Sequence, residues 1–118
     1  MTPFGEKLRE LRRIKGISQA KMAAALEVSP AYMSALEHGK RGVPSFSFMQ
    51  KLIQYFGLIW DEAENLQRLA KLSAPKVTID TSGMDARATL LANRLAEKIG
   101  HLNEGQLDAM IDIIDPQN

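Results

Sequence analysis

Apolar side chains recur every three or four positions through most of this 118-residue chain, which is the spacing of amphipathic helices and not of strands. Capping residues and glycines divide the pattern into segments. We expect one helix to begin after Ser45 or Ser47 and to stop at Gly57. The other expected helices cover about residues 3–15, 19–25, 30–37, 61–72, 85–99 and 103–114. The predicted fold class is therefore all-α.

The helical pattern breaks once, over residues 73–84. Pro75 and Gly83 bracket a short alternating stretch, Val77-Thr78-Ile79-Asp80, which is either a linker or one extended segment. Twelve residues without a helix are long for a connection inside one compact unit. We therefore expect a five-helix domain over 1–72, a linker or extended segment over 73–84, and a helical segment over 85–118.

Charge is distributed unevenly along the chain, although the formal net charge is only +1. Residues 1–60 carry nine basic and four acidic side chains, whereas residues 61–118 carry six basic and ten acidic ones. This asymmetry favours a polyanionic partner for the first half alone. The sequence shows no apolar run that would span a bilayer and no signal-peptide layout, so we expect a cytoplasmic protein without a membrane partner.

The most informative stretch is residues 18–37, which reads as two short helices joined by a tight turn. Ser18 suits the N-cap of the first helix, and Ser29 followed by Pro30 is a start signal for the second. Ala23 lies where the helices must cross, and its small side chain allows a close approach. This pattern is typical of a DNA-binding helix-turn-helix, whose second helix lies in the major groove.

The stretch and its flanks resemble the phage-repressor family of bacterial regulators, also described as Cro-like or xenobiotic-response-element regulators. The resemblance covers about residues 3–72. Its carrying residues are Leu8, Leu11, Arg12, Gly16-Ile17-Ser18-Gln19, Ala23, Val28-Ser29-Pro30 and Glu37-His38-Gly39-Lys40. It implies a repressor-like domain that binds double-stranded DNA. One departure is Glu27, which stands at a turn position usually given to Gly and is expected to adopt a left-handed conformation at some cost.

The resemblance also implies which side chains meet the duplex. Phosphate contacts are expected from the second helix and from the loop after residue 37, and base contacts from the outer face of helix 30–37. The full set of predicted DNA-binding residues is Gln19, Lys21, Ser29, Pro30, Ala31, Tyr32, Ser34, Ala35, His38, Lys40 and Arg41.

Helix 30–37 itself carries no Arg, Asn or Gln that could make a bidentate base contact, so direct readout should be modest. Tyr32, His38, Arg41 and DNA shape are expected to supply the rest. Two assignments stay open at this point. Lys21 either contacts a phosphate or points to solvent, and Tyr32 either contacts a base or is a half-buried packing residue.

Arg12 and Glu37 are expected to have a structural role. The resemblance implies a partly buried ion pair between them that fastens the first helix to helix 30–37.

The two C-terminal helices carry apolar stripes that two helices alone cannot bury. We expect these stripes to form a homodimer interface, because two-fold proteins read two-fold operators. Packing back onto the same chain is the alternative. The predicted interface residues are Leu91, Leu95, Ile99, Leu107, Met110, Ile111 and Ile114.

No residue pattern points to catalysis, a cofactor or a metal. The chain has no cysteine, and its two histidines, His38 and His101, are far apart in sequence. Asp108, Asp112 and Asp115 read as a solvated helix face. The sequence therefore predicts a transcriptional regulator, in the first instance a homodimeric repressor. Two alternatives stay open: an antitoxin that binds a toxin through residues 73–118, or an interaction module that has lost DNA binding.

Overall fold

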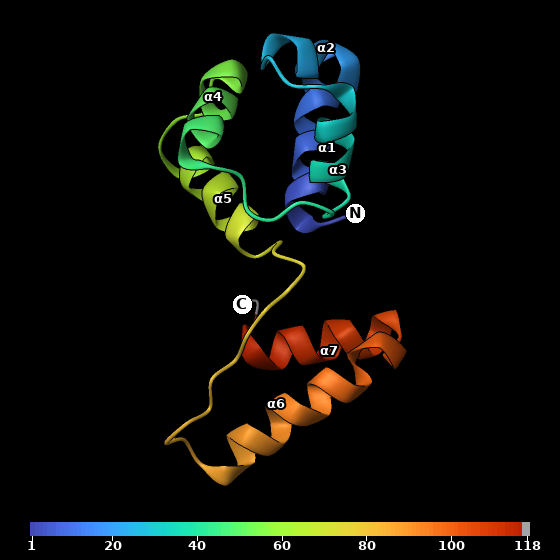
Figure 1. Cartoon of the computed structure of the whole chain (residues 1–118), viewed down its shortest axis with the longest axis vertical. Coiled ribbons are helices and arrows are strands. Elements are labelled where there is room, and N and C mark those ends of the chain that lie inside the picture. Colours follow the sequence, from blue (N-terminus) through green and yellow to red (C-terminus); the bar gives the residue numbers. More distant parts are fainter. Residues whose placement is uncertain (117–118) are drawn as a thin grey trace. The chain divides into compact units, whose positions relative to one another are not determined.

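The computed structural model describes residues 1–116, and these contain helices but no strand, which confirms the all-α prediction. The order along the chain is α1 (Pro3–Lys15), α2 (Gln19–Ala25), α3 (Pro30–Glu37), α4 (Phe46–Phe56), α5 (Trp60–Lys71), α6 (Ala86–Lys98), the 3-10 helix η1 (Ile99–His101) and α7 (Glu104–Ile114). The helices divide into two compact units, one over Met1–Val77 and one that begins at Thr78 (Figure 1). This division falls inside the stretch 73–84, where the helical pattern breaks.

The first unit is built around α1, which packs against both α3 and α5, while α2 packs against α3 (Figure 1). Serine and threonine side chains at Thr2, Ser18, Ser29 and Ser45 cap the first four helices by accepting backbone N–H bonds. The buried apolar core consists of Phe4, Leu8, Met22, Ala23, Leu26, Met33, Leu36, Phe48, Met49, Leu52, Leu58, Leu66 and Ala70.

Two backbone contacts place α1 on the C-terminal end of α3. The Thr2 N–H donates to the Glu37 carbonyl oxygen at 3.3 Å. At Gly5 the backbones approach so closely that a Cβ would collide with the Glu37 carbonyl group. The end of α3 is therefore held in place by the first turn of α1.

The end of α5 is tied to the same helix by Ser73. Its hydroxyl accepts a bond of 2.9 Å from the Phe4 N–H and donates one of 2.6 Å to the Leu69 carbonyl oxygen. Ser73 therefore belongs structurally to the first unit, one residue past the 1–72 range expected from the pattern.

Several large apolar side chains of the first unit lie at the surface, among them Ile14 and Trp60. Ile14 continues the spacing of the apolar stripe of α1, but it is 73% exposed and lies outside the core. It lies in the last turn of α1, which is followed by the C-cap Gly16 with φ 71°. Trp60 is 83% exposed and is not part of the core.

The second unit is a hairpin in which η1 forms the turn between α6 and α7 (Figure 1). Asn103 and Gln106 form a reciprocal capping box at the start of α7. Asp85 caps α6, and hydrogen bonds from the Arg87 side chain and backbone N–H hold the pKa of Asp85 below its ordinary value. No side chain between residues 78 and 116 is buried.

No helix within residues 1–116 is both long and apolar enough to cross a bilayer.

Candidate nucleic-acid interface

The turn between α2 and α3 contains one residue in the left-handed backbone conformation. Glu27 has φ 60°, as the departure from Gly at this position led us to expect. Ala23 and Met33 are fully buried and bring the two helices together. Ser29 then starts α3 by accepting the Tyr32 N–H at 3.0 Å, with Pro30 at the first helical position.

The outer face of α3 is lined by small side chains. Pro30, Ala31 and His38 are exposed, and Ser34 and Ala35 are half-buried. A shallow hollow of about 230 Å³ lies on this face, and its lining consists of Ala31, Ser34, Ala35, His38 and Lys40. Five of the predicted DNA-binding residues are thus brought together on one surface.

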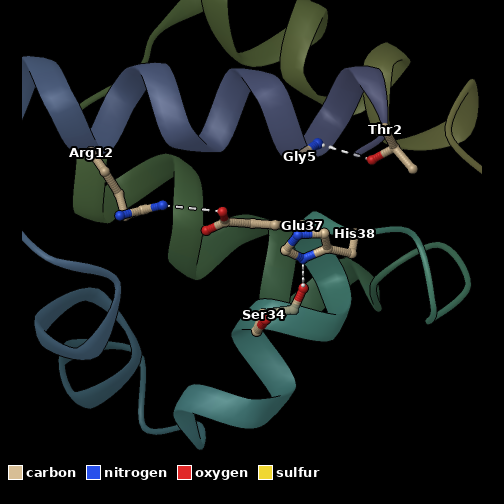
Figure 2. Close-up of polar contacts among 6 residues, drawn as sticks. All are labelled: Thr2, Gly5, Arg12, Ser34, Glu37 and His38. Carbon is tan, nitrogen blue, oxygen red and sulfur yellow. Dashed lines mark hydrogen bonds and ion pairs between the residues drawn. The ribbon is translucent and has the colours of Figure 1, made fainter.

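His38 closes the C-terminal end of this face in a defined orientation. Its Nδ1 lies 2.9 Å from the Ser34 carbonyl oxygen (Figure 2). A carbonyl oxygen only accepts, so Nδ1 must carry the proton. In the neutral ring, Nε2 is then an acceptor, and in the protonated ring it is a donor.

Arg41 lies over an aromatic ring that is itself anchored in the core. The guanidinium carbon of Arg41 is 5.6 Å from the centroid of the Tyr32 ring. The Tyr32 ring in turn meets the buried Phe48 edge-on, with centroids 5.7 Å apart and planes at 79°. Tyr32 therefore packs inward and supports Arg41 by a cation–π contact, which restricts where this cation can go.

Arg12 and Glu37 form the ion pair that fastens α1 to α3. Arg12 Nη2 lies 3.1 Å from Glu37 Oε1, and the Glu37 side chain is fully buried while that of Arg12 is 14% exposed (Figure 2). The pair places the negative charge of Glu37 behind α3, away from its outer face.

This placement matters for the electrostatics of the whole region. Glu37 is the only acidic residue between Val28 and Trp60, whereas Lys40, Arg41 and Lys51 in the same stretch are all exposed. The outer face of α3 and its following loop therefore carry cations and no exposed carboxylate of their own, and the nearest exposed carboxylate in sequence is Glu27, in the turn before α3.

The remaining predicted positions lie on α2. Gln19 is half-buried in the first turn, and Lys21 is exposed there. Sequence reasoning missed the support that Tyr32 and Phe48 give to Arg41, and it missed the contacts of Thr2 and Gly5 with Glu37. Thr2 and Pro3 are residue types that start a helix, but they do not reveal what the capped turn packs against.

Within residues 1–116, no group of three or more His, Cys, Asp or Glu side chains is arranged to hold a metal ion.

A family profile described as a helix-turn-helix domain matches residues 3–66. The chain belongs to this helix-turn-helix family. The matched range contains α1 to α4 and the first part of α5, including all of the surface described above.

Curated relatives carry the same domain. The chain is 36% identical over 83 residues to the HTH-type transcriptional repressor RghR of Bacillus subtilis. The aligned region covers 66% of this chain and 61% of that protein. It is 42% identical over 52 residues to the uncharacterized HTH-type transcriptional regulator RghRB of the same organism, over 44% of this chain and 37% of that one. It is 35% identical over 57 residues to the HTH-type transcriptional regulator RamB of Mycobacterium tuberculosis, over 48% of this chain and 12% of that one.

The chain thus spans less than two thirds of the length of each of these curated relatives. No solved structure matches it significantly.

Proposed function

We propose that this chain is a sequence-specific DNA-binding transcriptional regulator of the Cro-like type that acts as a homodimeric repressor. The observation that carries the proposal is the positive outer surface of α3 and its following loop, with the one carboxylate of α3 itself buried against Arg12. In this proposal α3 enters the major groove, and two copies read half-sites about one helical turn apart or a multiple of that spacing. The relative named a repressor supports the direction of regulation.

The roles of individual residues follow from their positions. Lys40 and Arg41 contact phosphates on one side of α3, and Gln19 and Lys21 contact phosphates from α2. Ala31, Ser34, Ala35 and His38 face the base edges. Ser29 and Pro30 form the N-terminal edge of this contact, and Tyr32 acts by positioning Arg41.

The second unit supports the dimer because its apolar side chains have nothing in their own unit to bury them. Leu91, Ile99, Ile111 and Ile114 are more than half exposed, and Leu95, Leu107 and Met110 are half-buried. Exposed apolar rows on two short helices are the signature of an interface. A four-helix arrangement of two hairpins would cover them.

Charge favours a second copy as the covering partner. α6 carries Arg87, Arg94 and Lys98 against a single Glu97, whereas the charged residues of α7 are Glu104, Asp108 and Asp112. In a two-fold pair, the basic α6 of each copy can lie beside the acidic α7 of the other.

The DNA-binding proposal is tested by the salt dependence of binding to duplex DNA, measured by fluorescence anisotropy. Arg41→Ala should weaken binding and reduce the slope of log K against log salt by about 1 per protomer. The control is Arg68→Ala, which removes one exposed cation of α5 and should leave the slope unchanged. Equal slopes for all three proteins, or no binding at low salt, would contradict the proposal.

The dimer is tested by sedimentation equilibrium. Ile111→Asp places a charge on a 61% exposed position of the proposed interface and should yield monomers. The matched control is Ile79→Asp, a 59% exposed isoleucine outside the helices, which should stay dimeric. An unmodified chain that stays monomeric at every concentration would instead assign this face to another protein, as in the antitoxin alternative.

A further inference from the structure

The outer face of α3 is unusual for a base-reading helix because its polar groups are few and partly used. Among the described residues, the Ser29 hydroxyl is engaged by the Tyr32 N–H, and His38 Nδ1 is engaged by the Ser34 carbonyl oxygen. This leaves Ser34 Oγ, His38 Nε2 and the O–H of Ser29 to face a ligand, each as a single hydrogen-bonding group. None of them supplies the paired contacts by which Arg reads guanine or Asn and Gln read adenine.

The hollow between these groups has a different character. The methyl groups of Ala31 and Ala35 line it, and the longest described side chains that line it are those of His38 and Lys40. Such a surface is complementary in shape to a small apolar group. Lys40 at its edge and Arg41 just beyond it are complementary in charge to a partner rich in phosphate.

We propose that this hollow binds the C5-methyl group of a pyrimidine in the major groove, so that the operator is read in part by methyl shape. The inference rests on the proposed DNA-binding function and names what α3 recognises. Of the four natural bases, only thymine carries a methyl group there, at C5. The same carbon is methylated in 5-methylcytosine. Thymine is the expected natural source.

The expected loss of DNA affinity follows from the contribution of one buried methyl group. Removing a buried methyl from contact weakens an interaction about fourfold. Because a two-fold complex has two such contacts, the loss for a symmetric operator is about 15-fold.

The test uses the full chain and a duplex chosen by affinity selection from random sequence. Each thymine of the selected duplex is replaced in turn by deoxyuridine, which keeps the base pair and its O4 acceptor and removes only the methyl group. At one or more positions per half-site, deoxyuridine should weaken binding about fourfold. If every deoxyuridine duplex binds within 1.5-fold of the parent while the parent still outcompetes scrambled DNA, the inference is overturned and the DNA-binding function stands. If no duplex is selected and none binds at low salt, the proposed function fails first.

A second measurement places the effect at the hollow. Ala31 is exposed, so Ala31→Leu should fold normally and fill the hollow. Measured at a salt concentration low enough for the variant to bind the selected duplex, this variant should lose the difference between thymine and deoxyuridine, whatever its overall affinity. A variant that still distinguishes the two bases would place the methyl contact elsewhere and overturn the inference.

The source of the methyl group is decided by a third duplex, in which the sensitive thymine–adenine pair becomes cytosine–guanine with or without a 5-methyl group. A gain of about fourfold on methylation shows that the methyl group alone is recognised. No gain shows that thymine is the source and that its O4 is read together with the methyl group.

Discussion

The ion pair between Arg12 and Glu37 gives the sharpest prediction of stability. Arg12→Met would remove the guanidinium that lies 3.1 Å from Glu37 Oε1 and leave a carboxylate with no exposed surface. The other carboxylate oxygen, Oε2, is already buried without a hydrogen-bond partner among the described residues. Among the described residues, Arg12 is the one cation that forms an ion pair with Glu37.

The two partners are not equivalent, because their exposure differs. Losing one partner of a buried pair costs about 3–5 kcal/mol when the other stays buried and charged. Arg12→Met should reach this range, which corresponds to a drop in Tm of about 25 °C for a unit of this size. Glu37→Gln should cost only about 1–2 kcal/mol, since the 14% exposed Arg12 side chain can still reach water.

The measurement is urea unfolding followed by far-UV circular dichroism, because the exposed Trp60 is a poor reporter of this core. The double variant Arg12→Met, Glu37→Met removes both charges and should recover most of the stability lost in Arg12→Met. A cost below about 1 kcal/mol for Arg12→Met would match a solvent-exposed pair and refute the reasoning. So would a double variant that is as unstable as Arg12→Met.

Three further predictions concern the backbone and the support of Arg41. Gly5→Ala should destabilise the first unit by several kcal/mol in thermal melts, because the new Cβ collides with the Glu37 carbonyl group. The control Gly105→Ala meets no such obstacle and should be neutral or stabilising by about 1 kcal/mol. Glu27→Gly should raise stability by about 0.5–1 kcal/mol in the same melts, because Gly adopts the left-handed conformation of this turn without strain. Tyr32→Phe should retain DNA affinity and Tyr32→Ala should lose about as much as Arg41→Ala in the anisotropy assay, because the ring and not the hydroxyl supports the guanidinium.

Local signals predicted the helices of this chain well. Capping side chains such as Ser18, Ser29 and Asn103 act on N–H groups two or three residues away, so their effect can be seen in sequence alone. Ile14 shows where local reasoning fails. Its spacing fits the stripe of α1, but whether a neighbouring helix reaches that last turn depends on tertiary packing, which periodicity does not contain.

The same distinction applies to the candidate site. The exposure of the small residues of α3 can be predicted from the helix-turn-helix pattern and from the periodicity of an α-helix. The position of Arg41 does not, because it depends on how the loop after Gly39 returns across Tyr32 and on the ring of Phe48 beneath it. A contact between residues nine positions apart through an irregular loop leaves no periodic signal.

The difference between the two units has a consequence for regulation by the proposed dimer. The first unit buries its own core, so one copy can fold and present α3 by itself. The second unit buries no side chain between residues 78 and 116, so its helices depend on the partner that covers them. Pairing two copies then turns two weak half-site contacts into one bivalent contact, and DNA affinity should rise steeply with protein concentration near the dimer dissociation constant. Ile111→Asp should abolish this steepness while leaving the weak half-site affinity of the single copy intact, which separates the role of the second unit from that of α3.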